Sequence, residues 1–430
     1  MQTILQVDFL VLVSLWIAPH ILALRLIKTG RHRILLSICL ISFAFAYLLK
    51  PSTSDLPKYS IYFDTGFSPT LPGDYSGRHA VLDPRDRIGT PFRGVFNDPK
   101  DLAISAFATL SKILHSTLPT GRILPRLAPL NETPFVSDSS IVAIMIIGVV
   151  VLLITLRNIL TYSKYIEFNI DSFLTCLVII LGSLFFMIGS QNALRQFLGT
   201  VFLLLSLSLT IRSRYIPSLV LMAISALFHP WMIFFALITF PLFLLIQSKY
   251  ELETTSWAGI TRKTWLLIFS FLTGCALVLF LKFGLSWVNN LQIGKWGMVH
   301  TYFFSRLQQY VFMEYSGLER IDPIIKCVLI SIVIVLSEII AGQNKHWGRL
   351  DFRTTRFSLY LFTLPFILLP EVFSRIMFVF FAIEILYICW AVCSEQLRYR
   401  LAGLTVFLAY GFAPNAINIL VGRGWVYGFG

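Results

Sequence analysis

The sequence predicts an all-helical, polytopic integral membrane protein, and two features of its composition support this prediction. Of the 430 residues, 56% are hydrophobic and only 13% are charged, and the mean hydropathy is +0.76. Soluble domains contain about 25% charged residues, and a soluble chain of this size lacks the volume to hide so much apolar surface. The composition therefore excludes a soluble enzyme, a disordered chain and a secreted disulfide scaffold.

Apolar stretches of about 20 residues, the length that crosses a bilayer, recur along the chain and predict about 12 transmembrane helices. The N-terminal stretch is expected to be a retained helix, because no signal-peptide cleavage pattern follows it. The stretch Tyr215–Gln247 is divided at His229-Pro230, since proline lacks an N–H and disfavours helix at the preceding residue; one kinked helix is the alternative. The expected spans are 4–26, 34–49, 141–156, 171–189, 197–211, 216–229, 231–247, 265–284, 324–341, 357–370, 376–394 and 401–421.

Basic residues are distributed unevenly among the predicted turns, and this predicts the orientation of the helices. If the turn after the first helix is cytoplasmic, the cytoplasmic connections hold 17 of the 35 Lys and Arg residues, whereas the opposite short connections hold only Arg195 and Arg375. The pattern requires two crossings within 215–247 and places both termini outside the cytoplasm. The net charge of +13 is thus a topology signal and predicts no nucleic-acid partner. The 17 residues are Arg25, Lys28, Arg31, Arg33, Arg157, Lys164, Arg212, Arg214, Lys249, Arg262, Lys263, Lys345, Arg349, Arg353, Arg356, Arg398 and Arg400.

The spans divide the chain into five parts, two of which are long outer loops. In the first loop an amphipathic pattern follows Asn97-Asp98-Pro99 and predicts a helix that lies on the membrane or caps the bundle. The second loop is rich in aromatic residues, which are typical of a membrane-interface belt; a platform for sugar rings is the alternative. The parts are 1–49 with the first two helices, the loop 50–140, 141–284 with helices three to eight, the loop 285–323, and 324–430 with the last four helices.

The cysteines and glycines give no sign of a metal or a nucleotide cofactor. Six cysteines lie in or beside apolar stretches, without a CxxC pair, so we expect small buried hydrophobic side chains and no metal site. Neither a P-loop nor a GxGxxG pattern is present, so we expect no nucleotide.

Polar groups at membrane depth tend to mark function, and one group of them lies at the outer turn between the fourth and fifth spans. Gln191, Asn192, Arg195 and Gln196 form it. A simple capping turn is one interpretation. However, Arg195 carries a positive charge on the outer face, where the short connections otherwise contain few basic residues. The planar, forked arrangement of its guanidinium N–H groups suits phosphate oxygens.

Three further candidates lie at outer helix ends. His229 is either a structural residue or part of a cavity, since broken backbone at membrane depth normally lines one. Glu371 and Arg375 are four residues apart, so they either form an ion pair on one helix face or act together on a ligand phosphate. Asp55 is a helix cap, a base or a sugar-hydroxyl acceptor. Glu338 and Glu384 lie in apolar helices, and the sequence names no partner for either.

Convergence of these residues on one cavity would suit an anionic, phosphorylated, membrane-embedded substrate. Arginines stabilise the charge that develops on a leaving pyrophosphate. A carboxylate or imidazole takes the proton of an attacking sugar hydroxyl. Composition does not select a sugar over another substrate.

The segment SQNALRQFLGTVFLLLSLSL and the following LVLMAISALFHPWMIFFALI resemble the EpsG/Wzy-type family of bacterial polysaccharide polymerases. The family's Asn-x-x-Arg-Gln element corresponds to Asn192, Arg195 and Gln196, and its later Phe-His pair to Phe228 and His229. SDLPKYSIYF resembles an early Asp-x-x-x-Tyr segment, placing Asp55 and Tyr59, with Tyr62 beside them. EVFSRIMFVFFAIEIL resembles the late helix start that carries an arginine, here Arg375.

The resemblance implies a lipid-dependent glycosyltransferase of the bacterial inner membrane, with its active site and both termini on the periplasmic side. Such an enzyme polymerises undecaprenyl-pyrophosphate-linked oligosaccharide repeats into O-antigen or exopolysaccharide, without a cofactor. A chain-length regulator and a flippase of the same pathway are expected partners, beside the lipid-linked oligosaccharide and the bilayer. Two alternatives are an O-antigen ligase, which transfers finished glycan to the lipid A core, and a lipid-linked oligosaccharide flippase or transporter. The assigned roles are Arg195 and Arg375 as pyrophosphate clamps, His229 as a proton relay or pocket residue, Asp55 or Glu371 as the base, and Gln191, Asn192, Gln196, Tyr59 and Tyr62 as substrate contacts.

Overall fold

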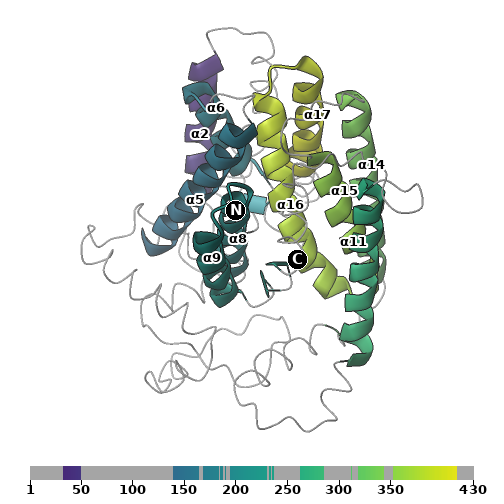
Figure 1. Cartoon of the computed structure of the whole chain (residues 1–430). Helices are drawn as coiled ribbons and strands as arrows, with labels where there is room; N and C mark the ends of the chain where they lie inside the picture. The colour runs from purple at the N-terminus through teal and green to yellow at the C-terminus, as the bar shows by residue number, and fades with distance from the viewer. Residues whose placement is uncertain are drawn as a thin grey trace, which may run out of the picture.

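In the computed structural model every regular element is a helix, and the helices pack as a bundle (Figure 1). This confirms the all-helical prediction for the part of the chain that is described. The first expected span, the expected amphipathic helix and most of both outer loops lie outside that part. The described residues are 32–49, 139–163, 168–183, 185–186, 189, 194–229, 232–233, 235–236, 262–284, 311, 318–342 and 352–413.

Apolar helices dominate the bundle. Within the described residues, four helices are long and apolar enough to cross a membrane, namely Met145–Tyr162, Thr264–Gly284, Ile321–Ala341 and Pro370–Cys393. Shorter apolar helices lie at α6, α8 and α9. The count of 12 spans stays a prediction. The helices are α2 (His32–Leu49), α5 (Ser139–Ser163), α6 (Ile170–Leu181), α8 (Leu194–Ile211), α9 (Tyr215–Phe228), α11 (Arg262–Leu279), the π-helix η3 (Phe280–Gly284), α14 (Leu318–Ala341), α15 (Phe352–Thr363), the 3-10 helix η5 (Leu364–Leu368), α16 (Pro370–Cys393), α17 (Leu397–Phe407) and the π-helix η6 (Leu408–Phe412).

The span 171–189 was expected to form one continuous helix. This prediction was wrong, because α6 ends at Leu181. The hydroxyl of Ser183 donates to the carbonyl oxygen of Ile180 at 2.7 Å and accepts from the N–H of Phe186 at 3.2 Å. A serine that binds nearby backbone groups in this way competes with the helical hydrogen bonds. Helical conformation resumes at residues 185–186.

The boundaries around the expected spans 357–370 and 376–394 were also wrong. The segment 371–375, expected as a connection, belongs to α16, which begins at Pro370. Proline suits the first helical position because the N–H that it lacks would have no partner there. The α15 helix begins at Phe352, before the expected span, and α14 likewise begins early, at Leu318.

The α16 helix forms the centre of the bundle, and every residue from Ile376 to Cys393 is buried. In Figure 1 it lies between α5, α6, α8 and α9 on one side and α11, α14 and α15 on the other. On the periphery, large apolar side chains face outward, including Ile216 at 79% and Ile339 at 69% exposure. Apolar exposure on this scale indicates a membrane or another partner around the bundle.

The cysteines behave as expected from their apolar surroundings. All six are free, five are buried, and Cys275 is half-buried. This confirms that they serve as small hydrophobic side chains.

Close contact between α11 and α15 depends on Gly274. A Cβ atom built there would overlap the backbone carbonyl oxygen of Phe362, and a backbone atom cannot move aside as a side chain can. We expect Gly274→Val to lower the free energy of unfolding by about 1–3 kcal/mol, the usual cost of overpacking. Thermal unfolding in detergent measures this. The matched change Ala276→Val, at an exposed position of the same helix, should have little effect, and equal losses in both variants would contradict the prediction.

Candidate functional site

A hairpin of α8 and α9 brings the end of α9 beside the beginning of α8. Near the turn of the hairpin, the hydroxyl groups of Ser206 and Ser218 lie 2.8 Å apart. Near its open end, the Ser225 hydroxyl donates to the carbonyl oxygen of Gly199 at 2.6 Å. These buried hydrogen bonds fix the register of the two helices, since a slip would leave the hydroxyls unsatisfied.

His229 lies at the open end of this hairpin, where α9 stops. The residue has extended backbone (φ −148°, ψ 110°), and its N–H donates to the Ser225 carbonyl oxygen at 3.1 Å. Its own carbonyl oxygen accepts from the N–H of Met232 at 2.9 Å. The break predicted before Pro230 is therefore present, and it holds a buried imidazole between two helical segments.

His229 packs directly against α8. A Cβ built on Gly199 would lie 3.2 Å from the Cβ of His229 and 3.1 Å from the Cγ of Met232. The absence of a side chain at this glycine is what permits the contact. His229 is therefore held beside Gly199, in the second turn of α8.

Gln196 connects the first turn of α8 to the first turns of α16. Its side-chain Nε2 donates to the carbonyl oxygen of Arg375 at 2.9 Å, and the glutamine is buried. Gln196 and Gly199 are three residues apart and so lie on one face of α8. The end of α9 and the start of α16 thus meet the same face of this helix.

Arg375 and Glu371 form an ion pair on the surface of α16. The Nη2 atom of Arg375 lies 2.8 Å from Oε1 of Glu371, and its Nε lies 3.1 Å from the same oxygen. The side chains are 24% and 26% exposed, so a ligand can reach the guanidinium. Of the two interpretations of this spacing, the structure shows the ion pair, and the carboxylate holds the guanidinium in place.

The structure thus brings Gln196, His229, Arg375 and Glu371 to one end of the bundle. Arg195 lies in the same first turn of α8 as Gln196, while its side chain is outside the described residues. Asp55, Tyr59, Tyr62, Gln191 and Asn192 lie outside the described residues altogether, so their assignments stay predictions. The site so far combines a guanidinium held by a carboxylate, a buried imidazole and a buried amide.

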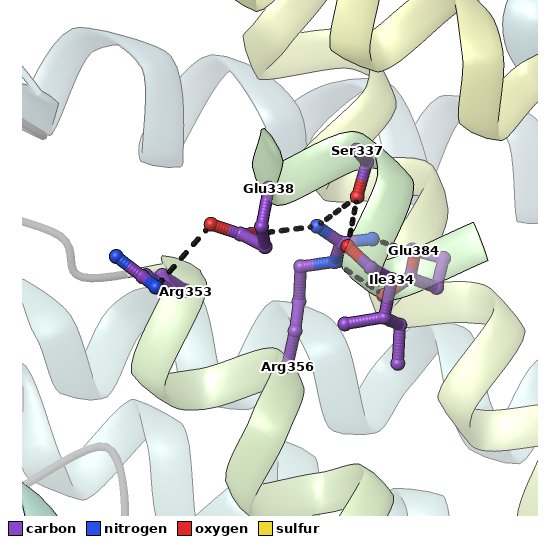
Figure 2. Close-up of polar contacts among 6 residues, drawn as sticks. All are labelled: Ile334, Ser337, Glu338, Arg353, Arg356 and Glu384. Atoms are coloured by element: carbon purple, nitrogen blue, oxygen red, sulfur yellow. Dashed lines mark hydrogen bonds and ion pairs between the residues drawn. The ribbon is translucent and has the colours of Figure 1, made fainter. Parts of the chain in front are cut away.

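A second polar cluster lies among buried residues of the bundle, and the sequence analysis did not predict it. Arg356 was expected in a cytoplasmic turn, which is wrong: it lies in α15 and is fully buried. It binds Glu384 of α16 through Nε and Nη2, at 2.7 and 2.9 Å, and Glu338 of α14 through Nη1 at 3.1 Å (Figure 2). The available signal was the presence of two carboxylates in apolar helices, because buried carboxylates require a cation.

The contact between Gly199 and His229 gives a test of the site. We expect Gly199→Leu to displace His229 and to lower any activity that depends on this site at least about tenfold, since small displacements of groups at a site have large effects on rate. Gly199→Ala should have a smaller effect, because one methyl group needs only a slight shift of its neighbours. The measurement is the yield of long-chain polysaccharide, the product that the sequence resemblance implies, per amount of membrane-inserted protein. Equal polymer yields from Gly199→Leu and wild type would contradict a role for this packing.

Comparison with known proteins identifies a family. The sequence model of the EpsG family matches residues 135–426, a segment that contains both polar clusters described above. The comparison with curated proteins and the comparison with solved structures gave no match.

Proposed function

Because the chain belongs to the EpsG family, we propose that it is a glycosyltransferase that joins oligosaccharide repeats linked to undecaprenyl pyrophosphate. Family membership indicates a polysaccharide-polymerase-like function, and the apolar helices indicate a membrane protein. The proposal further places the enzyme in a bacterial inner membrane with its site on the periplasmic side. The excess of basic residues in the opposite turns supports this orientation.

One observation carries the proposal. Gln196 ties the first turn of α8, which also contains Arg195, to Arg375 at the start of α16. Two arginines are thereby assigned to one end of an apolar bundle. Glu371 balances the charge of one of them, so these three residues keep a net positive charge that favours an anion. A lipid-linked pyrophosphate supplies that anion at this position in a membrane.

The guanidinium groups act on the leaving group. In the transfer, the bond between the anomeric carbon of the growing glycan and the pyrophosphate oxygen breaks, and the oxygen keeps the electron pair. The negative charge that develops there is stabilised by Arg375 and Arg195. Glu371 keeps the Arg375 side chain oriented before the substrate arrives.

The attacking group is a hydroxyl of the next lipid-linked repeat. Its oxygen forms the new glycosidic bond to the anomeric carbon, and its proton passes to a base. Asp55 and His229 are the candidates for that base, because a carboxylate or a neutral imidazole within reach of the hydroxyl accepts a proton. Glu371 suits this role less well, since it is held in an ion pair with Arg375.

Arg195 provides the direct test of the proposal. We expect both Arg195→Ala and Arg195→Lys to lower the yield of long-chain polysaccharide about 100-fold, the usual effect of removing one donor to a developing charge. Lysine is included because it keeps the charge and loses the two-pronged geometry that suits phosphate. The measurement is the chain-length ladder of surface glycan, with membrane protein levels determined in parallel. Normal ladders from both variants would remove Arg195 from the site.

A deletion strain distinguishes the proposal from the ligase alternative. Loss of a polymerase leaves single-repeat glycan on the cell surface. Loss of a ligase leaves long chains on the lipid carrier instead, which would overturn the proposal. Purified protein that elongates lipid-linked repeats in detergent would exclude a pure transporter.

A further inference from the structure

The cluster around Arg356 joins three helices at one buried point. The guanidinium of α15 bridges Glu384 of α16 and Glu338 of α14, and it also donates to the Ser337 hydroxyl at 3.1 Å (Figure 2). The ring of Tyr387 lies against the guanidinium, with 3.8 Å from Cζ to the ring centroid. Arg353 extends the cluster toward the surface, with its Nε 3.3 Å from Glu338. The two arginines and two glutamates leave the cluster electrically neutral.

Such a device matters for α16 because its long buried stretch is otherwise without charge. Between Ile376 and Cys393, Glu384 is its only charged residue, and every side chain in that stretch is buried. Between apolar helices in a bilayer the hydrophobic effect supplies little driving force, so packing and interhelical polar contacts determine how the helices associate. A single buried polar position is a well-attested way to specify register.

A slip of one turn illustrates the effect. A helix rises about 5.4 Å per turn, so the slip would replace Glu384 by Phe380 or Ile388 opposite Arg356. The guanidinium would then face an apolar side chain while still buried, and Glu384 would lose its partner. The bidentate pair between Arg356 and Glu384 therefore selects one axial position of α16.

The axial position of α16 matters because this helix begins at the candidate site. Arg375 lies nine residues before Glu384, which corresponds to about 14 Å along the helix axis. We propose that Arg356 is a positioning residue: through Glu384 it fixes the register of α16 and thereby the place of Arg375. The proposal rests on the proposed function, since it assigns Arg375 to the leaving pyrophosphate.

Native cysteines report the register without any assay of activity. The Sγ atoms of Cys176 on α6 and Cys393 on α16 lie 3.9 Å apart. Cys389 lies one turn earlier on α16, on the same face as Cys393, and its thiol also contacts Cys176. Oxidation of membranes with copper-phenanthroline, followed by peptide mass spectrometry, gives the ratio of the disulfide 176–393 to the disulfide 176–389. A one-turn slip of α16 changes this ratio in either direction, because it puts Cys389 in the native place of Cys393 or Cys393 in the native place of Cys389. In each case the other cysteine leaves Cys176.

The variant that tests the proposal removes both charges at once. In Arg356→Met/Glu384→Leu no unpaired charge remains at this pair, and Glu338 keeps Arg353, so the protein should still reach the membrane. We expect its 176–393 to 176–389 ratio to change severalfold and its polymer yield per protein to fall at least about tenfold. Arg356→Lys keeps a cation between the two carboxylates, so its ratio should remain closer to that of the wild type.

A matched control removes an ion pair within α14. Lys326 and Asp322 lie 2.5 Å apart on that helix, and Lys326→Met/Asp322→Leu should change neither the disulfide ratio nor the polymer yield. An unchanged ratio in Arg356→Met/Glu384→Leu overturns the positioning role. A changed ratio with unchanged polymer yield also overturns it, because α16 would then move without effect on the site. If the wild type itself forms no polymer, the proposed function fails, while the disulfide ratio still reports whether Arg356 sets the register.

Discussion

Arg375→Lys should lower the yield of long-chain polysaccharide about 100-fold, although lysine keeps the positive charge. The guanidinium binds two oxygens in one plane, whereas an ammonium acts as a point charge on a flexible stem. In the structure Glu371 already orients the Arg375 side chain through Nε and Nη2. Lysine cannot keep that orientation and reach the pyrophosphate in the same way.

The size of the effect separates two roles of Arg375. If it served only as the partner of Glu371, the loss would be small, because a partly exposed pair contributes about 0–1 kcal/mol to stability. A 100-fold loss corresponds to about 2.7 kcal/mol of transition-state stabilisation. Polymer yield per membrane protein is the measurement, with Arg398→Lys on α17 as the matched substitution outside the site. Similar yields from the two variants would contradict the assignment of Arg375.

The candidate site was predictable where short-range rules determine structure. The hydropathy pattern located the α8 and α9 helices, and Pro230 identified the break at His229. The four-residue spacing of Glu371 and Arg375 predicted that they would meet if the segment were helical. What the pattern did not reveal was that Pro370 begins α16, because the 3-10 helix Leu364–Leu368 lies directly before it and the apolar stretch continues across the boundary.

Contacts between distant parts of the chain were not predictable by the same rules. Gln196 and Arg375 are separated by 179 positions, and nothing local to either indicates the other. Arg356 was misassigned for a physical reason: a basic residue just before an apolar stretch matches the pattern of a cytoplasmic turn. Its burial follows from the early start of α15 at Phe352, together with the carboxylates on α14 and α16.

The second large effect concerns this buried arginine. Arg356→Met alone should lower the free energy of unfolding by about 3–5 kcal/mol, since it leaves a buried carboxylate without its partner. Glu384 is 1% exposed and has its two oxygens on the same guanidinium, so water cannot replace the lost bonds. Unfolding in detergent, followed by circular dichroism during titration with denaturant, measures the loss. Lys326→Met, which breaks a more exposed pair, should cost only about 0–1 kcal/mol.

Comparison with the double variant shows where that loss originates. If most of it is the cost of an unpaired buried charge, Arg356→Met/Glu384→Leu should regain the greater part, because apolar replacement of both partners is often close to neutral. Glu338 retains Arg353 in this variant at 3.3 Å, so the remaining carboxylate stays paired. Recovery of stability together with loss of the native register of α16 would mean that the pair specifies the position of the helix more than it strengthens the fold. Equal destabilisation of the single and double variants would instead mean that the ion pair itself contributes net stability.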